Sequence, residues 1–262
     1  MLALERQKKI LEILNKDGSV LVSRLSEQLC VTEETIRRDL EKLEKQEALI
    51  RTHGGAIPVD ENVYELSLEK RKNTNISSKE LLAAEAAKFI KPWDTVFLDA
   101  STTTFYMAKE IKSLKNVTVI TNSLRVINEL SGCPDIKLIG IGGLVSQNQS
   151  FVGSHAEDII KNTYFANKMF FSSKGIIDED TWVLESNEQE CAIKQKMIDN
   201  STERYFLCDK SKIGRVGFVK LAPFSKIDYF ITNYSPSPKW LKKFDDEGIT
   251  LVCCNDTAEE QL

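Results

Sequence analysis

The segment Thr32–Glu44 restricts the fold of this chain more than any other stretch. Ile36, Leu40 and Leu43 recur at helical spacing, so one face of a helix here is apolar and the charged residues lie on the other face. Thr32 is a favourable N-cap, which places the start of the helix directly after it. Taken alone, the segment is equally consistent with an ordinary amphipathic helix whose charges are solvated.

The flanking residues predict a helix-turn-helix with a wing. Arg6–Leu14 has the periodicity of a first helix, and residues 19–22 can form a short strand. Ser23 is expected to cap a short second helix, which a turn joins to the third. Residues 49–51 and the glycines at 54–55 then predict a strand that leads to a glycine tip. In a winged helix-turn-helix of this order, the third helix is the one that reads DNA.

The residues expected to contact DNA lie on the outward side of the third helix and on the wing. They are Thr35, Arg37, Arg38, Lys42, Arg51 and His53. Residues 1–58 contain ten Lys/Arg and ten Asp/Glu, so the formal charge of this segment is zero and only a local basic face can attract DNA. One copy should therefore bind weakly, and useful affinity requires a homo-oligomer, a dimer or larger, on paired half-sites.

The motifs of this region resemble the amino-terminal part of the DeoR family of bacterial transcriptional regulators. The matching stretches include residues 25–27 (LSE), 35–40 (TIRRDL) and 51–56 (RTHGGA). The resemblance implies a winged helix-turn-helix DNA-binding domain over residues 1–58, a linker over residues 59–77 and an effector-sensing domain over residues 78–262. A chain of 262 residues is long enough for two such domains.

Beyond residue 78, short apolar runs alternate with helical segments. Strands are expected at residues 95–98, 117–120, 136–141, 168–171, 205–208, 229–232 and 250–253, and helices at residues 78–90, 103–111, 123–130, 153–161, 188–200 and 239–247. Buried strands that are separated by helices favour a parallel sheet. The predicted fold class is therefore α/β, with a doubly wound, mostly parallel-sheet domain whose ligand crevice lies beyond the carboxyl ends of its strands.

Polar residues and glycines follow four of these strands, where a ligand would bind. The candidate effector-binding residues are Asp99, Ser101, Thr102, Thr103, Thr121, Asn122, Gly142, Gly143, Asp209 and Lys212. Backbone N–H groups, hydroxyls and the lysine ammonium could hold a phosphate against the positive end of a helix. Each segment alone is equally explained by helix capping, and it is their expected position on one sheet edge that favours a ligand.

This half of the chain is also similar to the DeoR sensor domain, which belongs with the ribose-5-phosphate isomerase-like folds. The matching pieces include residues 97–103, 121–123, 142–143 and 209–212. The resemblance implies a phosphorylated sugar or a related metabolite as the effector, and a change of operator affinity when it binds. Three departures from the family pattern concern this site: Ser101 replaces a glycine, residues 171–174 replace a more neutral segment, and Asn233 replaces an aspartate.

Together these features predict a sequence-specific DNA-binding transcriptional regulator, a repressor of carbohydrate-metabolism genes that a phosphorylated sugar releases from double-stranded operator DNA. The alternatives are a DNA-binding protein whose second domain only forms oligomers, and a sugar-phosphate isomerase. The isomerase is disfavoured because residues 171–175 contain no acid, and because Glu185, Glu188 and Glu190 are expected on solvated faces. No enzyme activity and no cofactor are expected.

The cysteine and hydropathy patterns bear on other classes of protein. The six cysteines lack CxxC spacing and the chain has only two histidines, so the thiols are expected to be reduced and mostly buried, without a metal site. No apolar run approaches about 18 residues. The amino terminus passes directly into a charged helix without the pattern of a signal peptide. A cytoplasmic protein without membrane contact is expected.

Overall fold

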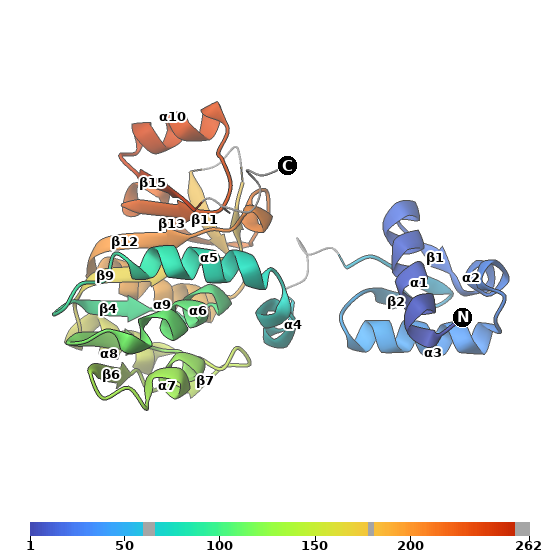
Figure 1. Ribbon diagram of the computed structural model, residues 1–262, viewed down its shortest axis with the longest axis horizontal. Coiled ribbons are helices and arrows are strands. Elements are labelled where there is room, and N and C mark those ends of the chain that lie inside the picture. Colours follow the sequence, from blue (N-terminus) through green and yellow to red (C-terminus); the bar gives the residue numbers. More distant parts are fainter. Residues whose placement is uncertain (60–65, 178–180, 255–262) are drawn as a thin grey trace. The chain divides into compact units, whose positions relative to one another are not determined.

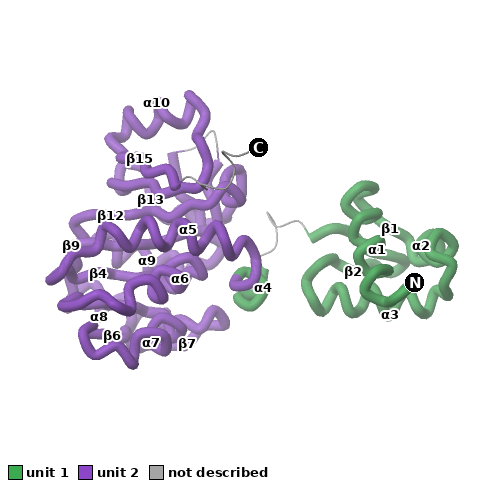
Figure 2. The backbone as a smooth tube through the Cα atoms, viewed as in Figure 1, with its two compact units in different colours: residues 1–71 green, residues 72–262 purple. Residues whose placement is uncertain are grey.

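The structure is a computed structural model that describes residues 1–59, 66–177 and 181–254. The chain divides into two compact units, residues 1–71 and residues 72–262 (Figure 2). Each unit has its own buried hydrophobic core, as expected for separate domains.

The stretch between the two expected domains is partly helical. Of the expected linker 59–77, residues 60–65 lie outside the described residues, as do residues 255–262 at the end of the expected sensor domain. Residues beyond 65 form α4 (Leu68–Asn73) and the beginning of α5 (Ile76–Ala87). The boundary between the two units therefore falls within α4, and α5 belongs to the second unit.

Residues 1–59 form three helices and a small antiparallel sheet (Figure 1). The elements are α1 (Ala3–Asp17), β1 (Val20–Leu21), α2 (Val22–Leu29), α3 (Glu33–Lys45), β2 (Ile50–Thr52) and β3 (Gly55–Ile57). The strand order is β1-β3-β2, so β2 and β3 form the predicted wing. Ile36, Leu40 and Leu43 of α3 are buried in one core with residues of α1 and α2, which confirms the predicted winged helix-turn-helix.

Close packing around β1 decides two local details. The prediction that Ser23 caps the second helix is wrong: α2 already begins at the buried Val22, and its N-cap is Leu21, which makes no side-chain cap bond. Gly55 begins β3 where a Cβ atom would lie 1.7 Å from the carbonyl oxygen of Val20. Glycine is therefore required for β1 and β3 to approach each other.

The second unit is built on a seven-stranded sheet (Figure 1). Its strands are β4 (Thr95–Leu98), β5 (Val117–Thr121), β6 (Ile136–Gly140), β9 (Ala166–Phe171), β12 (Ser201–Leu207), β14 (Tyr229–Thr232) and β15 (Thr250–Cys253). The order is β15-β14-β12-β9-β4-β5-β6, and every neighbouring pair is parallel. The chain first adds strands on one side of β4 and then adds β9 and its successors on the other. This confirms the predicted doubly wound fold.

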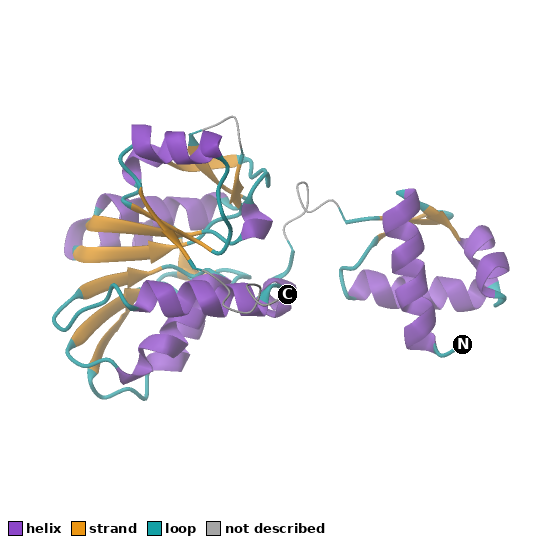
Figure 3. Ribbon diagram, turned by 45° about the horizontal axis from the view of Figure 1, so that its top comes forward, coloured by secondary structure: helices purple, strands orange, loops and turns teal. Residues whose placement is uncertain are grey.

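Helices cover both faces of this sheet (Figure 3). The first face carries α5, α6 (Thr102–Glu110) and α7 (Leu124–Leu130), and the second carries α8 (Ser154–Thr163), α9 (Glu188–Asp199) and α10 (Pro238–Asp246). Side chains alternate along each strand, so Val96 and Leu98 of β4 face the first group of helices and Phe97 faces the second. A sheet covered on both faces needs apolar residues throughout, which explains the apolar runs in the sequence.

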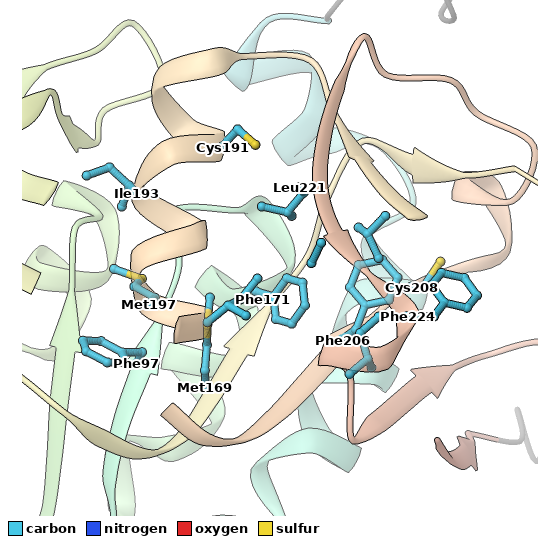
Figure 4. Packing of buried hydrophobic residues seen from close by; sticks show 14 of the residues in the cluster. Phe97, Met169, Phe171, Cys191, Ile193, Met197, Phe206, Cys208, Leu221 and Phe224 are labelled. Carbon is cyan, nitrogen blue, oxygen red and sulfur yellow. The ribbon is translucent and has the colours of Figure 1, made fainter. Parts of the chain in front are cut away.

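The core between the sheet and α9 is built from large apolar side chains (Figure 4). Phe97 and Met169 of the sheet lie beside Met197 of α9, and Phe171 and Phe206 extend the same layer. All five side chains are fully buried. Burying side chains of this size stabilises a fold by roughly 1.5–3 kcal/mol each, so this layer fixes α9 on the sheet.

Several short strands were not predicted. They are β7 (Leu144–Val145) and β8 (Phe151–Val152), which pair as a hairpin, and β10 (Gly175–Ile176), β11 (Trp182–Glu185) and β13 (Val219–Pro223), which form a separate antiparallel sheet. Short 3₁₀ helices occur at Ile111–Ser113, Lys210–Lys212 and Phe224–Lys226. Strands of two to five residues are too short for a recognisable alternating pattern.

Candidate functional site

The outward face of α3 carries residues that are predicted to contact DNA. Thr32 caps the helix as predicted, because its hydroxyl accepts a 3.3 Å hydrogen bond from the Thr35 N–H. Arg37 and Arg38 point to solvent, with 54% and 74% of their side chains exposed, and Lys42 is exposed further along the helix. The structure thus presents two guanidinium groups and one ammonium group on the accessible side of α3.

The wing carries the other two predicted residues, Arg51 and His53. Both are exposed, and together with Thr52 they line an open depression of about 460 Å³. The Arg51 N–H donates to the Glu44 carboxylate at 3.2 Å, and the Arg51 guanidinium lies 3.6 Å from the same carboxylate. Glu44 therefore attaches the wing to the last turns of α3.

Three basic side chains of α3 form ion pairs with the acidic residue four positions earlier. The pairs are Arg37 with Glu33 at 2.8 Å, Arg38 with Glu34 at 3.2 Å, and Lys45 with Glu41 at 2.8 Å. Exposed pairs of this type and orientation contribute only about 0.3–0.5 kcal/mol to helix stability. The arginines that are predicted to bind DNA are therefore held weakly by neighbouring carboxylates.

On the inner side of α3, Asp39 fixes the helix against α1. Asp39 is buried, and its carboxylate accepts hydrogen bonds from Arg6 Nε at 2.5 Å and from Gln7 Nε2 at 3.0 Å. The sequence signal for this contact is an acid directly before Leu40, on the apolar side of the helix. Sequence reasoning missed it, because the partner lies 33 residues earlier in the chain.

In the second unit, the strand order reverses between the neighbouring strands β4 and β9, and this place at their carboxyl ends is called the switch point. Asp99 follows β4 and is fully buried. Its Oδ1 accepts hydrogen bonds from the Ser101 N–H at 3.0 Å and from the Thr104 hydroxyl at 2.7 Å, and its Oδ2 accepts from the Ser172 N–H at 3.2 Å. Oδ2 also lies 3.3 Å from Nζ of Lys194. One carboxylate therefore joins the ends of both strands to the start of α6.

Lys194 of α9 is a second buried charge at this point. Its ammonium donates to the Ser172 carbonyl oxygen at 2.8 Å and to the Glu185 carboxylate at 2.5 Å. Burial lowers the pKa of Lys194, but the carboxylates of Glu185 and Asp99 more than offset this, so its pKa lies above the usual value. The expected solvated position of Glu185 is wrong: only 5% of the residue is exposed, because β11 packs beside α9.

Glu190 is also buried, so the expectation that it lies on a solvated face is wrong too. Glu188, in contrast, is exposed as expected. Glu190 Oε1 accepts hydrogen bonds from the hydroxyls of Ser146, at 3.1 Å, and of Ser150, which both belong to the β7–β8 hairpin. Burial raises the pKa of Glu190, although these bonds and the charge of Lys194 act against it. Glu190 thus joins the hairpin to the interior face of α9.

The start of α6 lies next to Asp99. Ser101 is its N-cap and accepts a 3.1 Å hydrogen bond from the Thr104 N–H. The φ of Ser101 is −68°, so this position does not need glycine and the departure from the family pattern causes no strain. Thr102 and Thr103 are buried in the first turn, and the Thr103 hydroxyl has no hydrogen-bond partner within the described part of the chain.

Beyond β5, Asn122 lies in a similar position. Its Nδ2 donates to the Phe151 carbonyl at 3.1 Å, while its buried Oδ1 has no partner among residues 1–59, 66–177 and 181–254. The Thr121 hydroxyl, by contrast, is fully used: it donates to the Leu98 carbonyl at 2.8 Å and accepts from the Ser123 N–H at 3.1 Å. Thr121 therefore ties β5 to β4.

The glycines after β6 differ in role. Gly143 has a φ of +151°, and a Cβ atom there would lie 2.9 Å from the Val152 carbonyl oxygen and 3.0 Å from Cβ of Ala156. Packing of the hairpin against α8 alone therefore explains this glycine. A Cβ at Gly142 would meet nothing within 4 Å.

The loop after β12 brings Lys212 to the switch point. Its ammonium donates to the Ser172 hydroxyl, and burial lowers the pKa of Lys212 against the opposing charge of Asp209. The Asp209 carboxylate remains in its own turn, where it accepts from the N–H and the hydroxyl of Ser211. Of the candidate effector residues, Asp99 and Lys212 are thus connected through Ser172, which sequence reasoning had not selected, and Ser101 is bonded to Asp99.

The same loop is bonded to the segment that leads into α5. Asn75 Nδ2 donates to the Ser211 hydroxyl at 2.9 Å. Asn233 accepts from the Lys210 N–H at 3.0 Å and donates to the Ser78 hydroxyl at 3.0 Å. Asn233, the third departure from the family pattern, is therefore a bridge between the loop and α5.

Residues 1–59, 66–177 and 181–254 contain no group of three or more His, Cys, Asp and Glu side chains that could hold a metal ion. The six cysteines are free, and Cys30 and Cys253 are exposed, so the expectation of mostly buried thiols holds only for part of the set. Within the same ranges, no helix is long and apolar enough to span a membrane.

Both units are similar to domains of known proteins. Residues 6–62 match the DeoR-like helix-turn-helix domain, and residues 74–234 match the DeoR C-terminal sensor domain. The HTH-type transcriptional regulator YulB of Bacillus subtilis is 42% identical over 253 residues, which cover 96% of this chain and 97% of that protein. The glycerol-3-phosphate regulon repressor of Escherichia coli is 31% identical and covers 95% of this chain and 98% of its own length.

Among solved structures, ribose 5-phosphate isomerase A of Methanocaldococcus jannaschii is a distant neighbour. It has 16% sequence identity and a TM-score of 0.41, and the match covers 53% of this chain and 55% of the isomerase. A likeness of this size carries no conclusion about activity. The family models and the full-length relatives, in contrast, span both units. The chain therefore belongs to the DeoR family of DNA-binding transcriptional regulators.

Proposed function

We propose that the protein is a repressor that leaves its operator when a phosphorylated sugar binds at the switch point of the second unit. The observation that carries this proposal is the convergence of Asp99, Lys194 and Lys212 on Ser172, from three different elements. Open α/β sheets bind ligands at this position. The relative that is named a repressor of the glycerol-3-phosphate regulon supports a phosphorylated metabolite as the signal.

The phosphate is assigned to the start of α6 and to Lys212. The N-terminal turn of a helix offers N–H groups and a positive partial charge to an anion. Lys212 adds an ammonium group at the same strand ends. Asp99 is not assigned to the ligand, because its carboxylate already accepts from Ser101, Thr104 and Ser172 and lies against Lys194.

The sugar hydroxyls are assigned to buried polar atoms that lack a partner in the described residues. Asn122 Oδ1 can only accept a hydrogen bond, so a ligand hydroxyl fits it and a phosphate oxygen does not. The Thr103 hydroxyl can donate or accept. Buried polar atoms without partners are rare and costly, and a bound polyol would satisfy both. Thr102, Gly142 and Asp209 complete the proposed surroundings.

DNA recognition is assigned to Arg37 and Arg38 of α3, with Thr35, Lys42, Arg51 and His53 beside them. If Arg38 reads a guanine edge, Arg38→Ala should cost about 1–3 kcal/mol of operator binding and relax the preference at one base position. Operator titrations with single-base substitutions measure this effect. Wild-type affinity of the Arg37→Ala/Arg38→Ala double variant would contradict the assignment.

The effector assignment is tested by thermal denaturation with a panel of phosphorylated sugars. A ligand at a hundredfold its dissociation constant should add about 2.7 kcal/mol of stability. The same ligand should then weaken operator binding in an anisotropy titration. Unphosphorylated sugars serve as controls, and a panel in which no phosphorylated sugar shifts the melting temperature contradicts the proposal.

The two alternative functions give different results in this experiment. A second unit that only forms oligomers predicts no ligand-induced shift, while the oligomer persists in sedimentation. An isomerase predicts that the stabilising ligand is converted into another sugar phosphate during incubation, which product analysis detects. A repressor predicts a shift and an unchanged ligand.

A further inference from the structure

Glu47 follows α3 in a backbone conformation that glycine normally adopts. Its φ is +53°, in the left-handed region, and the next N–H group, that of Ala48, bonds back to the Leu43 carbonyl at 2.9 Å. Helices that end in this pattern commonly have glycine at the left-handed position, because a Cβ atom costs energy there. A larger residue persists there only when its surroundings support it, and such outliers point to a function.

Both the side chain and the carbonyl group of Glu47 bind the start of α4. The carboxylate accepts a 2.9 Å hydrogen bond from the Ser67 N–H, and the carbonyl oxygen accepts from the Lys70 ammonium. The Ser67 hydroxyl in turn accepts from the Lys70 N–H at 3.3 Å. A helix of six residues is too short to be stable alone, so the position of α4 depends on such attachments.

Apolar packing also holds α4, but the bonds to Glu47 give its first turn a direction. Leu66 and Leu68 are buried, and burial stabilises without a preferred direction. Hydrogen bonds, in contrast, require defined distances and angles. At the other end of α4, the Lys72 carbonyl accepts from the Tyr106 hydroxyl of α6 at 3.4 Å. Glu47 therefore fixes the direction in which the chain leaves the first unit, which ends at residue 71.

From these contacts we infer that Glu47 is a specificity-determining residue, which makes the protein selective for the spacing of paired operator half-sites. The inference rests on the proposed binding of two copies of the chain to two half-sites. A stiff connection holds two DNA-reading units at one separation, whereas a flexible connection lets them reach half-sites at several separations. A flexible stretch as long as residues 60–71 spans roughly 20 Å, which exceeds the length of half a turn of DNA, about 17 Å.

The test uses the full-length double variant Glu47→Gly/Lys70→Met and an operator with paired half-sites that the wild-type protein selects from random DNA. Glycine adopts the left-handed turn without strain, so the variant removes both bonds at unchanged net charge. Inserting two base pairs between the half-sites moves one of them about 7 Å along the DNA and about 70° around it. The insertion should lower the affinity of the wild type at least about tenfold and that of the variant about threefold or less.

The matched control is Lys9→Met/Glu12→Gln, which removes one charge of each sign from exposed positions of α1. It should show the wild-type dependence on spacing. The Glu47/Lys70 variant should also bind a single half-site as the wild type does, because no proposed DNA contact is changed. A variant that is as sensitive to the insertion as the wild type would overturn the inference, and so would a wild type that tolerates the insertion. Equal wild-type affinities for one and two half-sites would instead contradict the binding of two copies, so the two failures are distinguishable.

Discussion

Asn75 Nδ2 donates a 2.9 Å hydrogen bond to the hydroxyl of Ser211. This bond joins the loop that carries Lys212 to the two residues between α4 and α5. Asn75 has a φ of +52°, a left-handed conformation that costs energy outside glycine and is maintained by its surroundings. Lys79 supports the same turn by donating to the Thr74 carbonyl at 2.6 Å. The proposed effector, if it moved the Lys212 loop, would therefore also disturb the segment between α4 and α5.

We predict that Asn75→Gly uncouples the effector from DNA. Glycine adopts the left-handed conformation without strain, so the variant removes the bond to Ser211 while leaving the turn possible. Effector binding should remain, whereas the effector-induced change in operator affinity should fall from the typical 1–3 kcal/mol toward zero. Thermal shift and operator titration measure the two quantities separately. A variant that releases the operator as wild type does would show that this bond carries no coupling.

Lys194→Met should destabilise the second unit by about 3–5 kcal/mol, because it leaves the buried carboxylates of Asp99 and Glu185 without their common cation. Urea denaturation at neutral pH measures the change. Lys212→Met is the matched control, since Lys212 is only half-buried and donates to a hydroxyl.

The Lys212→Met variant should lose less than about 1.5 kcal/mol. It should also bind the effector more weakly and keep its operator affinity in the absence of ligand. Equal destabilisation by the two substitutions would contradict the structural role that is assigned to Lys194.

The buried Glu190 should make stability depend on pH. Its folded pKa is raised above 4.5, so the folded chain retains a proton that the unfolded chain has released, and this contribution to stability is lost as pH rises from about 4.5 through the raised pKa. Glu190→Gln should remove this loss, since the amide oxygen can still accept from Ser146 and Ser150. Its unfolding free energy should therefore decrease less than that of wild type between pH 4.5 and neutral pH, as urea denaturation across this range would show.

The control for this prediction is Glu188→Gln, which removes the same charge from an exposed position on the same helix. This variant should follow the wild-type dependence on pH. If it matches Glu190→Gln instead, the effect comes from general charge and the burial of Glu190 is not its cause.

Operator binding should require two copies of the chain. The neutral charge of residues 1–58 leaves only the local contacts of α3 and the wing, so full-length protein should bind a DNA fragment with one half-site at least about a hundredfold more weakly than a fragment with two. Titration of both fragments at the same salt concentration checks this. Equal affinities would mean that one copy is sufficient.

Local patterns were enough to predict the winged helix-turn-helix and the seven strands of the parallel sheet. The helical spacing of apolar residues such as Ile36, Leu40 and Leu43 indicates which face of a helix is buried. The N-cap at Thr32 depends on residues within one turn of the helix, so it too can be predicted from neighbouring residues. The strand ends at Asp99 and Asn122 could be located for the same reason, because each lies directly after an apolar run.

The contacts between the polar side chains of the site could not be predicted in this way. Ser172 and Lys194 meet Asp99 across separations of 73 and 95 residues, and Glu185 reaches the site by pairing with Lys194. No local pattern marks a polar side chain that a distant segment will cover. The sequence alone therefore determined the main helices of both units and the strands of the parallel sheet, and it predicts which helix faces DNA. Only the packing of β9, β11 and α9 around β4 decided which charges are buried together, because burial and pairing are properties of neighbours in space.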